Sequence, residues 1–152
     1  MLRAIKSILL DRLEDLKEGK HWSNRLVEHQ MDDALMQHFE RSNVPLDGKL
    51  ISTLKMYALN RFQRLWRCSS IQQLVNHKHK LWYIFERTDA EKIDKITLYC
   101  APDLAIQIQS RWLLIRFDMQ GEMENHNSEL EATAMVLWSQ RREGLPKSPE
   151  RY

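Results

Sequence analysis

Residues 48–85 read GKLISTLKMYALNRFQRLWRCSSIQQLVNHKHKLWYIF, and the spacing of apolar residues changes within this stretch. Before Lys80 the apolar residues recur every three or four positions, as on one face of a helix. After Lys80 the run LWYIF at 81–85 is aromatic and branched, which is typical of a strand. We therefore predict that residues 1–80 are almost wholly helical and that strands fall only between about 81 and 118.

The first predicted helix begins near the N-terminus and ends at Gly19. Its narrow apolar face resembles the seam of a coiled coil. The interpretation we favour is a helix packed on its own domain; the alternative is a homodimer seam. In that alternative, the two copies would meet through Leu2, Leu9, Leu13 and Leu16.

Three further helices are predicted before Lys80. One begins at residue 23 or 24 and reaches Glu40, because Pro45 and the residue before it disfavour helix. Asp47 is a good N-cap for the next, which should reach about Arg67, and Ser69 and Ser70 then open a short fourth helix.

Strand patterns dominate residues 81–118. Residues 95–100 alternate in polarity, and RWLLIRFD at 111–118 is apolar on both faces in its middle, which suits a central strand. The polar residues 86–94 suit an exposed loop. Residues 102–109 are ambiguous: we favour a short helix opened by Pro102 and Asp103, while IQIQ at 106–109 alternates like an edge strand.

The last predicted helix begins near Ser128, where Ser128 and Glu131 have the spacing of a capping box, and ends before Gly144 and Pro146. The whole order predicts an α+β fold. It has an N-terminal half of three to four helices, a small, mostly antiparallel sheet of three to four strands, and a C-terminal helix. We predict a single domain over residues 1–146 and a flexible tail at 147–152.

Charge and cysteine usage restrict the class of protein. Residues 1–80 carry 14 Lys or Arg and 9 Asp or Glu, whereas residues 81–152 carry 9 and 12, so the net charge of +2 hides an asymmetry. Cys68 and Cys100 are far apart and in no metal-ligand spacing, which favours free thiols in a reducing compartment. With no apolar run of about 20 residues, we predict a cytoplasmic protein and no membrane segment.

The sequence contains no phosphate-binding glycine loop, no GxSxG and no HExxH motif. We therefore predict a non-catalytic protein without cofactor or metal, and keep an enzyme of unrecognised type as an alternative. That alternative would use His29, Asp32, Asp33 and His38, since His29 and Asp33 share a helix face.

The 38 residues from Gly48 to Phe85 contain no Asp or Glu, although ordinary surfaces mix both signs. On a helical wheel, several cations lie beside the apolar stripe that contains Phe62. We predict a small adaptor or regulatory protein that docks an acidic protein partner through this side; the alternative is a nucleic-acid-binding protein with the same residues. The candidate binding residues are Lys49, Tyr57, Arg61, Arg64, Trp66, Arg67, Lys78 and Lys80.

Overall fold

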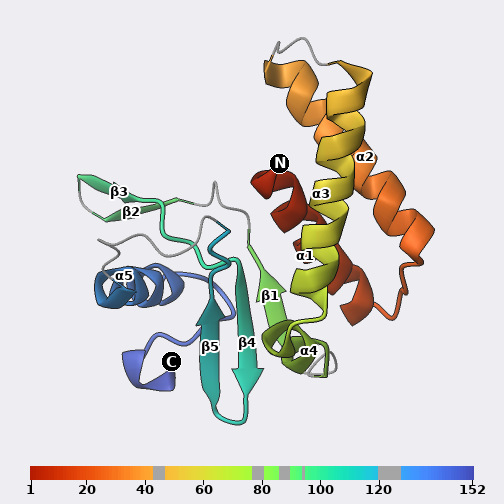
Figure 1. Cartoon of the computed structure of the whole chain (residues 1–152). Helices are drawn as coiled ribbons and strands as arrows, with labels where there is room; N and C mark the ends of the chain where they lie inside the picture. The colour runs from red at the N-terminus through yellow and green to blue at the C-terminus, as the bar shows by residue number, and fades with distance from the viewer. Residues whose placement is uncertain (43–46, 77–80, 86–89, 94, 120–127) are drawn as a thin grey trace. The chain divides into compact units, whose positions relative to one another are not determined.

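The computed structural model describes residues 1–42, 47–76, 81–85, 90–93, 95–119 and 128–152. The chain forms two compact units, residues 1–79 and residues 80–152 (Figure 1). The single domain predicted for residues 1–146 stays a prediction.

The N-terminal unit is helical, as predicted. Its helices are α1 (Leu2–Lys17), α2 (Asn24–Ser42), α3 (Gly48–Trp66) and α4 (Ser69–Asn76). The three longer helices pack against one another in pairs, and α4 follows the end of α3 (Figure 1). Their contact faces are apolar; the most buried side chains include Ile5, Leu9, Leu13, Met31, Leu35 and Phe62.

The apolar face of α1 is part of this core. Leu9 and Leu13 have no exposed surface and Leu16 is 8% exposed, while Leu2 is half-buried. Because α1 packs against both α2 and α3, these side chains already have partners within the chain. The predicted homodimer seam is therefore left without support.

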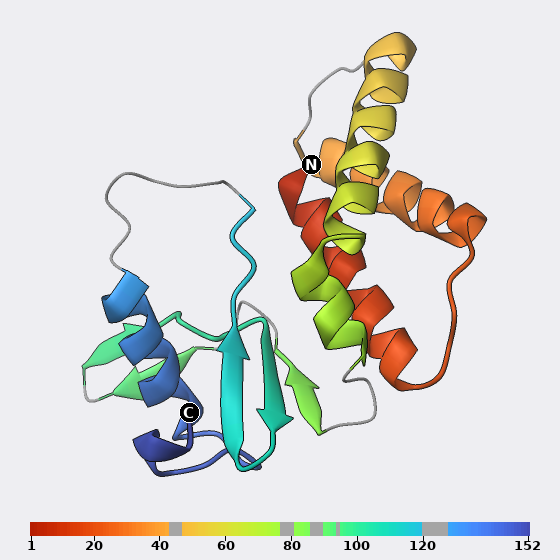
Figure 2. The same cartoon turned by 60° about the horizontal axis from the view of Figure 1, so that its bottom comes forward.

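The C-terminal unit contains two small antiparallel sheets. The larger has the strand order β1 (Trp82–Ile84), β4 (Leu104–Ile108) and β5 (Arg111–Ile115). The smaller pairs β2 (Glu91–Ile93) with β3 (Ile96–Leu98). Together with helix α5 (Ser128–Ser139), which lies beside the strands in Figure 2, these elements confirm the α+β class.

Three local predictions for this unit were wrong. The short helix favoured at 102–109 is strand β4, β2 occupies part of the predicted loop at 86–94, and the central strand is β4 rather than β5. Asp103 explains the first correction: its backbone N–H donates to Ile115 O (2.8 Å), and its carbonyl accepts from Phe85 N (3.2 Å). Its backbone groups therefore bond to neighbouring strands instead of opening a helix.

Aromatic side chains hold the C-terminal unit together. Tyr83 stacks on Trp112 with ring centroids 5.6 Å apart, and Phe85 meets the buried Trp138 of α5 edge-on at 5.2 Å. Offset and edge-on pairs of this kind are favourable beyond the apolar area that they bury. The first pair joins β1 to β5, and the second joins the end of β1 to α5.

Residues 147–152, for which the sequence predicts a flexible tail, form a 3-10 turn at Pro149–Arg151 and end in Tyr152. Tyr152 packs against the buried cluster of Ala105, Trp112 and Leu145, and its hydroxyl donates to Pro146 O at 2.9 Å. Arg151 Nε donates to Ser110 O at 2.9 Å.

In the described part of the chain, every helix is too short or too polar to cross a lipid bilayer.

Candidate binding site on helix α3

Local interactions build α3 as the sequence predicts. Asp47 is its N-cap, and the Asp47 carboxylate accepts a hydrogen bond from the N–H of Lys49 at 2.7 Å. Ala58 and Phe62 are fully buried on the side that faces α1 and α2. The opposite side of α3 is therefore left to solvent.

Cations occupy that exposed side. Lys49, Arg61, Arg64 and Arg67 are all exposed. Among the described residues, Lys49, Arg64 and Arg67 have no ion-pair partner. Lys55, on the other flank of α3, forms an ion pair with Asp32 of α2. We call Lys49, Tyr57, Arg61, Arg64 and Arg67 the α3 face.

Lys78 and Lys80, predicted to extend the α3 face, lie outside the described residues.

Large apolar side chains are exposed beside these cations. Tyr57 is 58% exposed, Met56 61% and Leu50 46%. Tyr57 lines a shallow depression with Asn60, Arg61 and Arg64. Cations and apolar groups are therefore interleaved on one exposed surface.

Trp66 lies apart from the α3 face. Its ring stacks on that of Phe62, with centroids 6.3 Å apart and planes 14° apart. The Arg12 guanidinium of α1 lies over Trp66, its Cζ 3.8 Å from the ring centroid, and 5.8 Å from the centroid of Phe62. Cation–π contacts of this length stabilise the packing of two helices.

Sequence reasoning missed Arg12. Its position on α1 carries no motif, and the contact with Trp66 joins residues far apart in the chain. The amphipathic pattern of α1 shows only that Arg12 lies next to Leu13 and Leu16, at the border of the apolar face. The ring that covers it becomes identifiable only when α1 and α3 are packed.

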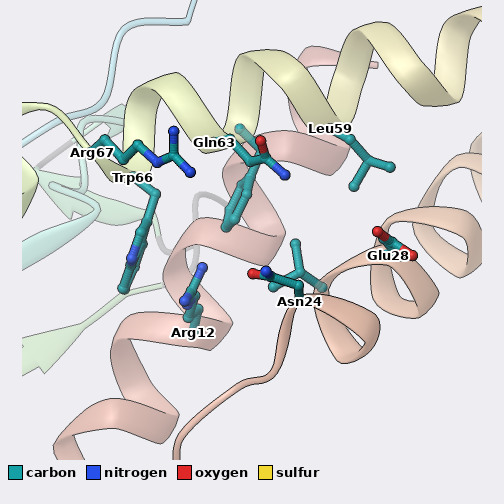
Figure 3. Close-up of a pocket in the computed structure, with 9 residues that line it drawn as sticks. Arg12, Asn24, Glu28, Leu59, Gln63, Trp66 and Arg67 are labelled. Carbon is teal, nitrogen blue, oxygen red and sulfur yellow. The ribbon is translucent and has the colours of Figure 1, made fainter.

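Arg12 is at one end of a small hollow between α1, α2 and α3 (Figure 3). Asn24 and Glu28 of α2 and Gln63 and Arg67 of α3 also line it. In Figure 3 the Arg12 guanidinium points between Trp66 and Gln63, and Glu28 lies towards the other end of the hollow. The remaining lining is apolar and comes from Val27, Leu59 and Phe62.

The Arg12 guanidinium is half-buried, and this burial lowers its pKa from the ordinary value. Within the part of the chain that the structure describes, no carbonyl or carboxylate accepts a hydrogen bond from it. Among the described residues, the Arg12 charge therefore contacts mainly aromatic rings, and the side chain lines the hollow.

The residues of the enzyme alternative form separate pairs. His29 Nδ1 lies 2.9 Å from Asp33 Oδ2 on the exposed side of α2, whereas Asp32 pairs with Lys55. His38 is exposed, and its ring lies 5.9 Å from that of Phe39. No group of three or more His, Cys, Asp or Glu among the described residues is arranged to hold a metal ion.

No protein-family model matches the sequence, and no curated protein or solved structure matches it either. The function is therefore inferred from the residues themselves.

Proposed function

We propose that this chain is a small non-catalytic adaptor or regulatory protein of the cytoplasm that docks an acidic protein partner through the α3 face. The observation that carries the proposal is the mixture of exposed cations and exposed apolar side chains on one side of α3. Arg64 and Arg67 have no ion-pair partner among the described residues, and Tyr57 beside them is 58% exposed. Arginine and tyrosine are the residue types most enriched at the energetic centres of protein interfaces.

The second candidate is a nucleic-acid-binding protein that uses the same cations. It needs exposed rings on which bases can stack, and Tyr57 and Trp66 are the rings predicted for that role. Arg12 covers one side of Trp66 at 3.8 Å, and the ring is half-buried beside Phe62. Of the two predicted rings, Tyr57 alone stays exposed, which favours the protein partner.

The test is the double charge reversal Arg64→Glu/Arg67→Glu in the full chain. Both side chains are exposed, so we expect a change in unfolding free energy of only about 0.5 kcal/mol. Affinity for the partner, captured from native lysate with and without nuclease, should fall at least about tenfold because like charges then face each other. The matched control is Arg3→Glu/Arg25→Glu, which makes the same charge change at exposed positions outside the α3 face.

Salt dependence separates the two candidates. A nucleic-acid partner would make log K fall linearly with log salt, by about 0.7–0.9 for each phosphate contact. Losing two contacts would then flatten that slope by about 1.5 to 2. Binding of a protein partner should persist after nuclease treatment, and the double variant should not flatten the slope of log K against log salt in this way. Binding by the double variant that equals wild type would overturn both candidates.

A further inference from the structure

The hollow between α1, α2 and α3 is lined by the guanidinium of Arg12, which has no hydrogen-bond acceptor within the described part of the chain. A guanidinium has five N–H donors, and none of those of Arg12 has an acceptor among the described residues. The contacts that Arg12 does make are with aromatic rings, its Cζ lying 3.8 Å from the centroid of Trp66 and 5.8 Å from that of Phe62. Arg12 also lines the hollow, so its N–H donors are available to a group that enters there.

The neighbours of Arg12 in the hollow can complete a site for an anion. Arg67 and Gln63 of α3 and Asn24 of α2 line it, and each has N–H groups that can donate (Figure 3). Arg67 has no ion-pair partner within the described ranges. Two guanidiniums and two amides thus surround one small space.

The half-burial of Arg12 gives an incoming anion an energetic advantage. Removing a charge from water costs free energy, and here that cost is already met in the unbound protein by the packing against Trp66. Hydrogen bonds between arginine and a carboxylate are charge-assisted and often bidentate, so they are stronger than neutral ones. A rigidly stacked guanidinium also loses little side-chain entropy on binding.

We propose that this hollow binds a carboxylate of the partner, with Arg12 and Arg67 as its two cationic contacts. The inference rests on the proposed function, because it assigns one anchor of the acidic partner. It extends the proposed docking surface from the α3 face to the hollow, which residues of α1 and α2 also line.

Glu28 favours a carboxylate over a phosphate group. Its carboxylate lines the same hollow and has no ion-pair partner among the described residues. Arg12, Arg67 and Glu28 together leave one positive charge, which suits a single carboxylate. A phosphate carries about one and a half to two negative charges at neutral pH and would be repelled more strongly by Glu28.

The experiment uses the full chain labelled with nitrogen-15 and a short blocked peptide of alternating glutamate and leucine. The peptide should shift the Arg12 Nε–H resonance and the Trp66 indole resonance, which Arg12→Gln and Trp66→Phe assign. Its glutamine counterpart should shift neither. Inorganic phosphate, at the same ionic strength as chloride, should displace the peptide no better than chloride does.

Variants of Arg12 measure how much its bidentate guanidinium contributes to the affinity for the peptide. Arg12→Gln should weaken the peptide at least tenfold, and Arg12→Lys, which keeps the charge but loses the bidentate geometry, should weaken it three- to tenfold. Arg3→Gln, an exposed arginine outside the hollow, should leave affinity unchanged. Thermal unfolding of each variant shows whether it is folded, and the Arg12 resonance of the wild type reports on the site independently of any variant.

The outcomes separate this inference from the proposed function. If Arg64→Glu weakens the peptide while Arg12→Gln binds it as wild type does, the hollow is not the site but the α3 face stands. If neither variant weakens it, both proposals fail. An Arg12 shift produced equally by phosphate or by the glutamine peptide would overturn the assignment of a carboxylate.

Discussion

The guanidinium carbon of Arg12 lies 3.8 Å from the ring centroid of Trp66, and this contact ties the first helix of the N-terminal unit to the end of the third. It also covers one side of the ring that base stacking would need. This one cation–π contact therefore helps to distinguish the two candidate partners.

The coupling between Arg12 and Trp66 should be measurable as an interaction free energy. In a double-mutant cycle with Arg12→Gln and Trp66→Leu, we expect a coupling of about 0.5–2 kcal/mol, the range for cation–π contacts from exposed to desolvated sites. Urea unfolding of the four proteins gives this value. A control cycle that combines Arg3→Gln with Trp66→Leu should give no coupling, because Arg3 is exposed and does not contact Trp66. Equal coupling free energies in the two cycles would contradict the contact.

Gly144 should tolerate a side chain less well than Gly19. Both glycines have φ +81°, a left-handed conformation in which a β-carbon is strained by about 1–2 kcal/mol. A β-carbon at Gly144 would also lie 2.9 Å from the Tyr83 hydroxyl, whereas no atom of the described residues lies within 4 Å of one at Gly19. Chemical denaturation of the two alanine variants should therefore show a greater loss of stability for Gly144→Ala. Adding Tyr83→Phe to Gly144→Ala should recover part of that loss; no recovery would mean that the hydroxyl is not the obstacle.

The two thiols should differ in reactivity although both are free. Burial raises the pKa of Cys100, nearby Arg116 offsets this only in part, and its Sγ donates to Ala134 O at 3.1 Å. Because the thiolate is the reactive form, Cys100 should label at least about tenfold more slowly than the half-buried Cys68 in native protein. Single serine variants assign the two rates. Denatured, unreduced protein should label at both positions, and failure there with recovery after reduction would reveal a disulfide.

Tyr152 should titrate at unusually high pH. Burial of its ring raises the pKa of the phenol to about 12, from an ordinary 10.0. Since the folded pKa is above the unfolded pKa, its contribution to stability is complete below pH 10.0 and is lost as pH rises through about 12. The pKa of Tyr152 is obtained by titrating the phenolate absorbance of the wild type and of Tyr152→Phe and taking the difference between the two curves. A Tyr152 transition near the ordinary value would show that residues 147–152 are not packed in solution.

The helices of the N-terminal unit and the exposed side of α3 could be predicted from the sequence, because the interactions responsible are local. The period of Ala58 and Phe62 and the cap at Asp47 specify where α3 begins and which side it buries. The cations Arg64 and Arg67 then follow from the helical wheel, and both are exposed. Neighbouring residues alone carry this information.

Only the tertiary structure decided the position of β4 and the surroundings of Trp66. Asp103 bonds through its backbone to Phe85, which directly follows β1, and to Ile115 of β5, so a local signal for helix was overridden. Arg12 and Trp66 meet because α1 and α3 pack together, and no spacing along the chain encodes that meeting. Contacts between distant residues depend on how faces pair in space, and a helical or strand period specifies a face but not its partner.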